Sequence, residues 1–501
     1  MRTIATTALP QQVIVPAYDR NRLTTKIVHF GFGAFHRAHQ GVYTDELANQ
    51  FNSDWGICEV SLFSGKPLLK QSVVSFYHSD PLLKQLQQQG HLYSVVEKNA
   101  TRPVIKVIGC VRESMHPDID GKQAIIDKMA EPQIAIVSLT ITEKGYCCDT
   151  NTGQLNSLHP LIQHELQSPT APNSVIGYLV QALRVRRDKG LPAFTVMSCD
   201  NLQENGRVTR DAVVGFARLL DASLADWIQK NVTFPCTMVD RIVPAVTEDT
   251  LDEIAKLLGV SDPCGVVCEA FRQWVIEDNF VAGRPDWNLV GAKFVNDVIP
   301  FEEMKLRMLN GSHSFLAYLG YLAGYEYIAD AMADPAFKKA ALALMLNEQA
   351  PTLTMPKGTD LEVYAASLID RYCNTNIKHR TWQIAMDGSQ KLPPRLLNSI
   401  RYHLKNGSDF THLALAVAGW MHYVSGVDKQ GEAIDVRDPL AATLKSICDK
   451  HGPNVSVVKA LVLVDEIFAK DLIKSEVFIN SIEMAYQTLL LKGAKHSVAE
   501  L

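Results

Sequence analysis

The first 295 residues of the chain alternate between short apolar segments and longer amphipathic segments, and this alternation constrains the fold more than any other feature. The apolar segments are rich in Val, Ile and Thr, which is typical of strands covered on both faces. Amphipathic segments between such strands are typical of helices that connect parallel strands. We therefore predict a doubly wound α/β domain with strands over 26–30, 56–63, 134–140, 194–199 and 236–243 and with helices that include 174–188 and 205–220.

The pattern changes near residue 295, after which strand-like segments nearly disappear. Long amphipathic segments separated by Pro and Gly take their place, and they predict helices over 302–322, 361–372, 412–427 and 476–491. We therefore predict two domains. Residues 1–295 form the α/β domain, and residues 296–501 form a mostly α-helical domain.

The composition argues against several classes of protein. The chain has 501 residues, of which 47% are hydrophobic and 21% charged, as in an ordinary globular protein. Its net charge of −5 argues against binding of nucleic acid through a basic surface. No apolar run reaches the roughly 18 residues of a membrane helix, and residues 1–12 lack the apolar core of a secretory signal, so we expect none. The 10 cysteines include no CxxC pair, so we expect no disulfide framework and no metal site. A cytoplasmic protein without a membrane or nucleic-acid partner is the simplest expectation.

A glycine-rich turn follows the first predicted strand. Residues 31–36 read GFGAFH and stand between the strand KIVHF and a helical stretch, the place of the phosphate-binding turn in a Rossmann-like domain. Gly31 would allow the tight turn, and Gly33 would let the backbone approach a pyrophosphate. His36 replaces the third glycine of the usual fingerprint, so an ordinary strand–helix turn stays open as an alternative.

The second predicted strand bears on the choice between NAD and NADP. An acid at the end of this strand would bind the ribose 2′-hydroxyl of NAD. The strand instead ends at Ser64-Gly65-Lys66, and Glu59 lies too early in it. Lys66 would favour the 2′-phosphate of NADP or lie solvated in a loop.

Three clusters of polar residues are candidates for chemistry. On an α-helix, Lys305, Asn310 and His313 would lie at about 0°, 140° and 80°, on one side, where they could transfer a proton and polarise a carbonyl. Asn201 follows the predicted strand 194–199, where ligand-binding residues of open α/β sheets gather. Basic residues between His379 and Lys391 could hold an anionic substrate. Solvated helix faces, caps and turns are the alternatives for all three clusters.

Long stretches of the chain resemble the mannitol dehydrogenase family of polyol-specific long-chain dehydrogenases. The resemblance runs from about residue 26 to residue 490. It is carried by GFGAFHRAHQGVYTDEL, SLTITEKGYC, FTVMSCDN, FPCTMVDRIVP, FRQWVIEDNFVAGRPDW, KLRMLNGSHSFLAYLGY and HRTWQIAMDGSQKLPPRLL.

The resemblance implies a metal-free dehydrogenase that uses a nicotinamide cofactor. Lys305 matches the general acid/base of the family, Asn201 and Asn310 match the amides that polarise the reacting oxygen, and His313 matches the histidine that orients substrate and lysine. The branch of the family that the chain resembles most, described below, implies NAD as the cofactor. Lys66 and the missing acid at the end of the second predicted strand leave NADP open. The candidate cofactor-binding residues are Gly31, Phe32, Gly33, Ala34, Phe35, His36, Arg37, Thr142 and Asn201.

The resemblance also implies where the substrate binds. Lys391 and Glu302 match substrate-site residues of the family, and Asp240 matches an aspartate to which we assign structural support. Mannitol-oxidising relatives have an arginine in place of Gln383 and a glycine in place of Arg307. Because such differences gather on residues able to bind an anion, we hypothesise that Arg307 or Arg380, together with Lys391, meets a substrate carboxylate.

The segments KLRMLNGSHSFLAYLGY and HRTWQIAMDGSQKLPPRLL resemble most closely the branch of the family that reduces D-fructuronate to D-mannonate in hexuronate catabolism. The reaction so implied is a reversible hydride transfer to the ketone carbon at C5, with Lys305 as the proton donor. Tagaturonate (altronate) reductase and mannitol or arabinitol 2-dehydrogenase stay open as alternatives, as does a nucleotide-binding sensor without catalysis. We expect a monomer or a weak homo-oligomer.

Overall fold

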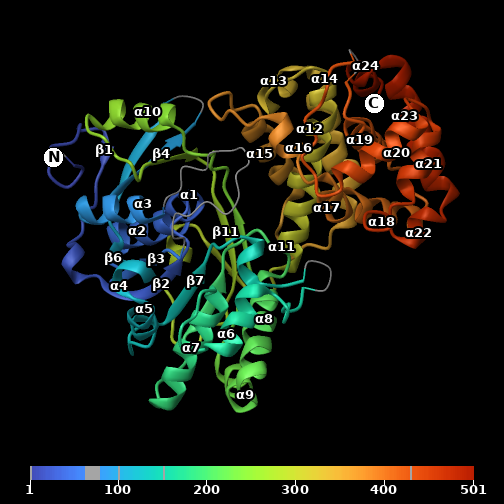
Figure 1. The fold of residues 1–501 in the computed structure, drawn as a ribbon. Helices are drawn as coiled ribbons and strands as arrows, with labels where there is room; N and C mark the ends of the chain where they lie inside the picture. Colours follow the sequence, from blue (N-terminus) through green and yellow to red (C-terminus); the bar gives the residue numbers. More distant parts are fainter. Residues whose placement is uncertain (1–2, 63–78, 100–101, 150–152, 429–430) are drawn as a thin grey trace. The chain divides into compact units, whose positions relative to one another are not determined.

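The computed structural model describes residues 3–62, 79–99, 102–149, 153–428 and 431–501. The chain divides into two compact units, Met1–Val298 and Ile299–Leu501. The first unit is α/β and the second is helical (Figure 1). Among the described residues, no helix is both long and apolar enough to cross a membrane. All ten cysteines are free thiols.

A five-stranded parallel sheet forms the centre of the first unit. Its strands are β6 (Val111–Met115), β3 (Trp55–Val60), β2 (Thr24–Phe30), β7 (Ile136–Leu139) and β8 (Thr195–Ser198), in that spatial order. Every neighbouring pair is parallel. The chain continues from β2 to β3 on one side and adds β7 and β8 on the other, so the connections change direction beside β2. Ligands of doubly wound folds bind at such a switch point. The predicted doubly wound fold is confirmed.

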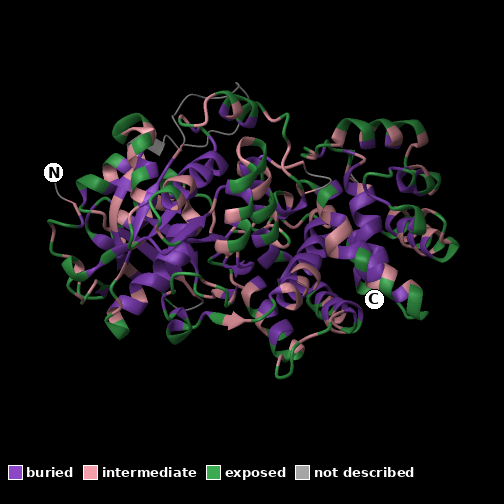
Figure 2. Cartoon of the chain, turned by 90° about the horizontal axis from the view of Figure 1, so that it is seen from below, coloured by how far each residue is buried: buried purple, intermediate pink, exposed green. Residues whose placement is uncertain are grey.

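Both faces of this sheet are covered, which explains why its strands are apolar throughout. One large apolar core joins the sheet to the helices α5, α7, α8 and α9, and a second core joins its other face to α2 and to strands of a second sheet. Figure 2 shows in purple how many residues of the chain are buried. These helices are α2 (Gln40–Phe51), α5 (Lys122–Met129), α7 (Val175–Asp188), α8 (Asn205–Leu220) and α9 (Ala222–Asn231).

Two smaller sheets complete the first unit. One has the order β1-β5-β4-β10, and the other has the order β12-β11-β9. The shorter helices and turns are η1 (Arg20–Arg22), α1 (Ala34–Ala38), α3 (Ser79–Gln88), α4 (Pro117–Asp120), η2 (Glu143–Tyr146), α6 (Pro160–Gln167), α10 (Glu248–Leu258) and η3 (Trp287–Val290). The strands of the two smaller sheets are β1 (Val13–Ile14), β4 (Tyr93–Lys98), β5 (Val104–Ile108), β9 (Thr237–Asp240), β10 (Val266–Glu269), β11 (Gln273–Glu277) and β12 (Lys293–Val295).

The strand predicted over 236–243 does not extend the parallel sheet. It is β9, and it pairs antiparallel with β11. The side chain of Asn205 lies beside β9 in place of a strand: its amide donates to the carbonyl of Thr237 at 2.9 Å, and its oxygen accepts from the amide of Thr237 at 2.9 Å. β9 is therefore buried, as its apolar sequence indicates, but by a different neighbour.

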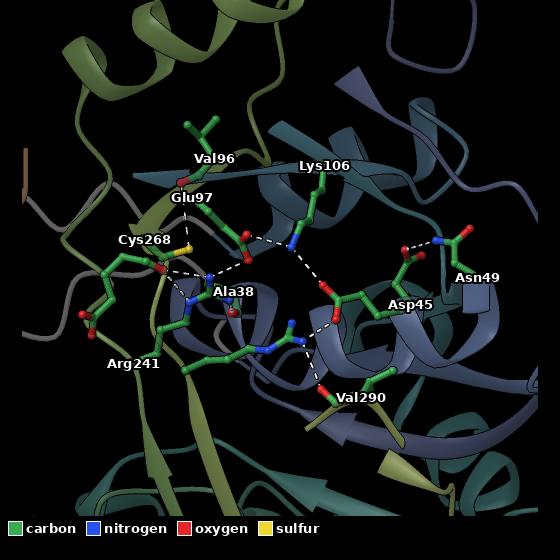
Figure 3. A network of polar contacts seen from close by, with 12 residues as sticks. Ala38, Asp45, Asn49, Val96, Glu97, Lys106, Arg241, Cys268 and Val290 are labelled. Carbon is green, nitrogen blue, oxygen red and sulfur yellow. Dashed lines mark hydrogen bonds and ion pairs between the residues drawn. The ribbon is translucent and has the colours of Figure 1, made fainter. Parts of the chain in front are cut away.

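A buried network of charges links the sheet β1-β5-β4-β10 to the helices α1 and α2 (Figure 3). The Arg241 guanidinium donates to the carbonyls of Ala38 at 2.6 Å and Glu269 at 3.0 Å and pairs with the Glu97 carboxylate at 2.6 Å. Lys106 continues the network by pairing with Glu97 at 2.7 Å and with Glu46 at 2.9 Å. Arg241 thereby fixes the end of α1 to the strands β4 and β10.

The second unit is a helical assembly around α12 (Ser312–Leu322) and α19 (Thr411–Tyr423). Nearly every residue of these two helices is buried, and they approach closely at Gly419, where a Cβ would lie 2.8 Å from a methyl group of Leu319. Beyond β12, the described residues form no strand. The other helices are α13 (Ile328–Ala333), α14 (Pro335–Ala343), η5 (Leu344–Gln349), η6 (Ala350–Thr352), α15 (Leu361–Tyr372), α16 (Thr381–Ala385), α17 (Gly388–Leu392), η7 (Pro393–Leu397), α18 (Asn398–Asn406), α20 (Ala441–His451), α21 (Ser456–Val462), α22 (Lys470–Ile473), α23 (Glu476–Lys492) and α24 (Ala494–Ala499).

Side-chain caps explain several of the predicted helix starts. Ser174, Asp360 and Ser475 each accept a hydrogen bond from a backbone amide in the first turn of α7, α15 and α23, respectively. Such caps satisfy amides that have no partner within the helix. The predicted helix over 302–322 is, in contrast, interrupted: α11 (Ile299–Met304) and α12 flank a π-helical segment, η4 (Lys305–Gly311).

We expect the variant Arg241→Ala to lower the free energy of unfolding of the first unit by about 3–5 kcal/mol, because it leaves two buried carbonyls without their donor and leaves Glu97 with Lys106 as its remaining partner. The measurement is urea unfolding followed by the fluorescence of the buried Trp274 and Trp287. Arg218→Ala is the matched control, since Arg218 is 51% exposed and pairs with Asp226 on the surface. Its loss should stay below about 1 kcal/mol. Equal losses in both variants would contradict the assigned role of Arg241.

Candidate active site

The turn after β2 has a conformation that only glycine adopts easily. Gly31 has a φ of 112°, and a Cβ on it would overlap the carbonyl oxygen of Thr140 at the end of β7. The carbonyl of Gly31 accepts hydrogen bonds from the amide of Gly33 at 2.6 Å and from the Thr140 hydroxyl at 2.9 Å. At Gly33, which precedes α1, a Cβ would have 3.8 Å of space to its nearest neighbour. The turn is therefore packed closely against β7 at Gly31 and open at Gly33.

Three of the predicted cofactor positions lie along one edge of the sheet. Gly31, Thr142 and Asn201 follow the carboxyl ends of β2, β7 and β8, and parallel strands bring these ends to the same edge. Thr142 has a φ of 62°, which is strained for a β-branched residue. The Asp200 carboxylate holds this strained loop by accepting from the amides of Ile141 at 2.9 Å and Thr142 at 3.0 Å.

The aromatic and basic residues of the turn point largely into the protein. Phe32, His36 and Arg37 are buried, whereas Ala34 and Phe35 are half-buried. The Arg37 guanidinium lies 5.1 Å from the Phe32 ring and donates to the carbonyls of Gly33 and Cys264. Arg37 thus supports the turn from inside the first unit. Lys66, on which the choice between NAD and NADP depends, lies outside the described residues.

A fully buried polar cluster lies beneath the turn. The His36 ring nitrogen is 2.7 Å from the Glu59 carboxylate, and the His29 and His36 rings stack with their centroids 3.4 Å apart. Burial lowers the pKa of both histidines and raises that of Glu59 to about 7. Three such residues form a donor set for a metal ion. The two stacked rings are only 15° from parallel, so their in-plane lone pairs cannot converge on one ion.

The predicted catalytic residues of the second unit lie around the π-helical segment. Lys305 begins η4, Asn310 lies near its end, and His313 lies in the first turn of α12. The angles expected for a regular α-helix do not apply here, because η4 has i→i+5 hydrogen bonding. All three side chains are nevertheless buried, with 9%, 7% and 5% exposed. Asn310 Nδ2 and His313 Nε2 have no hydrogen-bond partner within the described part of the chain, so both are available to a ligand.

The surroundings of His313 keep its imidazole neutral. Burial lowers its pKa well below the usual value, and His379, Arg371, Arg395 and Lys305 lower it further. The His379 ring lies 5.3 Å from that of His313, and burial together with Lys391 lowers its pKa to about 4. A neutral imidazole offers both a donor and an acceptor nitrogen to a bound hydroxyl or carbonyl group.

The predicted anion-binding residues differ in how their charges are already compensated. Arg307 pairs with Glu303 at 2.9 Å and donates to the Thr352 carbonyl at 2.6 Å. Arg380 is 46% exposed and pairs with Glu326 at 3.2 Å.

The other two candidates for the substrate site are Lys391 and Glu302. Lys391 donates to the backbone carbonyls of Met386 at 2.5 Å and Ile384 at 3.3 Å, and Glu302 is buried. The sequence analysis did not predict Arg395 as a candidate for the substrate site. Its position four residues after Lys391, in KLPPR, would have indicated a second cation near Lys391.

Comparison with known proteins identifies the family. The model of the mannitol dehydrogenase Rossmann domain matches residues 25–289, and that of the mannitol dehydrogenase C-terminal domain matches residues 297–490. The chain belongs to the mannitol dehydrogenase family. As a member of it, the protein is an oxidoreductase that acts on a CH–OH group.

Several relatives are similar over nearly their full length. The chain is 58% identical to D-mannonate oxidoreductase of Escherichia coli K12, with 100% of both chains covered. It is 39% identical to the solved mannitol 2-dehydrogenase of Pseudomonas fluorescens in its ternary complex with NAD and D-mannitol, with a TM-score of 0.83 and 98% and 97% of the two chains covered. A solved D-sorbitol dehydrogenase is 33% identical, with a TM-score of 0.88 and 98% of both chains covered.

The variant Gly31→Ala tests the turn. We expect it to destabilise the first unit by about 2–3 kcal/mol and to weaken dinucleotide binding, because the added Cβ meets the Thr140 carbonyl in an unfavourable backbone conformation. Gly259→Ala is the control: Gly259 has a φ of 70° but open space around its Cβ, so only the backbone penalty of about 1 kcal/mol applies. Thermal unfolding and NADH titration measure both effects, and equal behaviour of the two variants would contradict the packing argument.

Buried histidines predict a loss of stability in acid. The pKa values of His29 and His39 are lowered by burial to about 3 from 6.5, so their contribution to stability is complete above pH 6.5 and is lost as the pH falls from 6.5 toward 3. Glu59 has the opposite effect on stability, because its raised pKa makes folding more favourable as the pH falls. The buried histidines with lowered pKa values outnumber it. We expect urea unfolding to show a free energy that falls with pH below 6.5. The slope should flatten in His39→Gln and not in His164→Gln, an exposed control; identical slopes in the two variants would refute this.

Proposed function

We propose that the protein catalyses the reversible, NAD(H)-dependent reduction of D-fructuronate to D-mannonate in hexuronate catabolism. The observation that carries this proposal is the 58% identity to D-mannonate oxidoreductase over the whole of both chains. The cations Arg371, Arg395 and Lys305 near His313 support it, because a sugar acid brings a negative charge. We further propose that the protein acts in the cytoplasm as a monomer or weak homo-oligomer.

A nicotinamide dinucleotide fits the edge of the parallel sheet. The NAD bound in the solved mannitol 2-dehydrogenase supports a nicotinamide cofactor, and NAD is our proposal for this chain. Residues 31–37, Thr142 and Asn201 would hold it, with the open backbone at Gly33 nearest the pyrophosphate. In this proposal residues 1–295 bind the cofactor, and residues 296–501 carry the proton-transfer and substrate-binding groups.

The residues of the second unit suit the chemistry of this reduction. A bound reduced nicotinamide supplies the hydride that reaches the ketone carbon at C5. The Nζ of Lys305 then gives a proton to the oxygen on which negative charge develops, and in the reverse direction neutral Lys305 takes the proton from the hydroxyl. The amide groups of Asn310 and Asn201 donate hydrogen bonds to this oxygen, each worth about 3–4 kcal/mol in the transition state. His313, as a neutral imidazole, orients the hydroxyl groups, while Lys391 and Glu302 bind the substrate.

A mannitol or arabinitol 2-dehydrogenase is the second candidate, because mannitol dehydrogenases are among the similar proteins. A tagaturonate (altronate) reductase would use the same groups on an epimeric substrate. A sensor without catalysis would have no need of the buried polar set formed by Lys305, Asn310 and His313.

The assay that tests the function measures oxidation of NADH and NADPH with D-fructuronate, D-tagaturonate and D-fructose in parallel. We expect the highest kcat/KM with D-fructuronate and NADH. Lys305→Ala should lower kcat by about 10²- to 10⁴-fold, because it removes the proton donor. Lys459→Ala, at a residue 65% exposed, should leave kcat unchanged. A preference for D-fructose would make the protein a polyol dehydrogenase, and NADH binding without any turnover would make it a sensor.

A further inference from the structure

We propose that Arg395 binds the carboxylate of the sugar-acid substrate and thereby sets the preference of the site for acids over polyols. This inference rests on the proposed function and adds to it a residue that determines specificity. It replaces the expectation that Arg307 or Arg380 holds the carboxylate.

The first observation is that the Arg395 guanidinium is half-buried beside the predicted catalytic residues with neutral partners only. It donates to the Ser314 hydroxyl at 3.2 Å and to the Asn310 carbonyl at 3.5 Å. Both acceptors belong to the segment that carries Asn310 and His313. Within the described residues, no carboxylate forms an ion pair with Arg395. A guanidinium withdrawn from water in this way gains strongly from a bound anion.

The second observation is that the charges with the strongest effect on the two buried histidines are positive. Arg395, Arg371 and Lys305 disfavour protonation of His313, and Lys391 disfavours protonation of His379. Burial lowers the pKa of Arg395 itself to about 10, which agrees with a positive charge that lacks a compensating carboxylate. Cations of the second unit thus act on both imidazoles where the substrate is expected.

The third observation is the spacing of the two cations that follow Gly388. Lys391 and Arg395 are four residues apart in the continuous helical run of α17 and η7, so they lie on the same side of it. Arg395 influences His313 and Lys391 influences His379, and the two rings are 5.3 Å apart. The cations therefore flank the histidine pair, at which His313 Nε2 has no hydrogen-bond partner in the described structure.

The arginines expected to bind the carboxylate are less suited to it. Arg307 and Arg380 each have a glutamate at ion-pair distance, Glu303 and Glu326, so a substrate carboxylate would have to compete with an existing anion. Arg395 has no such competitor. Its planar fork of donors matches the two oxygens of a carboxylate, whereas the hydroxyl groups of a polyol gain much less from it.

The test compares acid and neutral substrates in the full-length enzyme. In Arg395→Gln we expect the KM for D-fructuronate to rise about 10- to 100-fold, as for the loss of a charge-assisted hydrogen bond, with kcat changed by less than about 3-fold. The KM for D-fructose should stay within about 2-fold. Arg395→Lys, which keeps the charge but not the fork, should recover part of the loss. Arg401→Gln is the matched control, since Arg401 lies on α18 and pairs with Asp471 at the surface.

Two results would overturn the inference. An unchanged KM for D-fructuronate in Arg395→Gln would show that the carboxylate binds elsewhere. Parallel losses with D-fructuronate and D-fructose would show that Arg395 only holds the segment from Asn310 to Ser314 in place.

A binding measurement separates this inference from the proposed function. D-Mannonate and D-mannitol are titrated calorimetrically into the wild-type enzyme and into Arg395→Gln, each in the presence of NADH. If the wild type reduces no uronate, the proposed function fails. Arg395-dependent binding of D-mannonate, with D-mannitol unaffected, would then still support the carboxylate site. Equal binding of D-mannonate by both proteins would overturn it.

Discussion

The buried guanidinium of Arg241 is the interaction on which the geometry of the first unit depends. It joins the last residue of α1 to the second sheet through the Ala38 and Glu269 carbonyls and the Glu97 carboxylate. α1 has only five residues, too few to be stable as an isolated helix, so tertiary contacts must hold it in place. The Gly31 turn precedes α1 directly and inherits its position. A charge that is not among the predicted cofactor-binding residues therefore positions the backbone that would contact the cofactor.

Polar groups and backbone strain are concentrated at the same edge of an otherwise apolar sheet. His29, His36 and Glu59 are buried under the turn, and Thr142 is held in a strained conformation by the Asp200 carboxylate. Each of these features costs stability, and the apolar cores on both faces of the sheet offset that cost. Their concentration at the switch point is what a ligand-binding edge requires, because a fully relaxed apolar edge would offer no directional contacts.

The sequence predicted the strands that are apolar throughout. It did not predict the strands whose buried charged residues need ion-pair partners from elsewhere in the fold. β2, β3, β7 and β8 are apolar runs, and the capped helices α7, α15 and α23 begin as predicted. β4 and β5 were missed because they contain Glu97 and Lys106, which pair with each other and, elsewhere in the fold, with Arg241 and Glu46. The π-helical turn at Lys305 has no periodic signature, so the relative angles of the candidate residues could not be predicted. Motif resemblance supplied the candidate residues themselves, which spacing alone left open.

In the second unit, the residues proposed for catalysis differ from those proposed for substrate specificity. In the proposed mechanism Lys305, Asn310 and His313 act on a hydroxyl or carbonyl group, which acids and polyols share, so they would not discriminate between the two classes. Charge can discriminate, because cations act on the histidine pair, whose imidazoles are kept neutral first by burial and then by these cations. If both imidazoles were charged, they would add to the excess of positive charge and bind any anion strongly and without direction. Because they are neutral, the proposed site leaves the anion to the guanidinium of Arg395 and the ammonium of Lys391, and the imidazoles would bind the hydroxyl groups next to it.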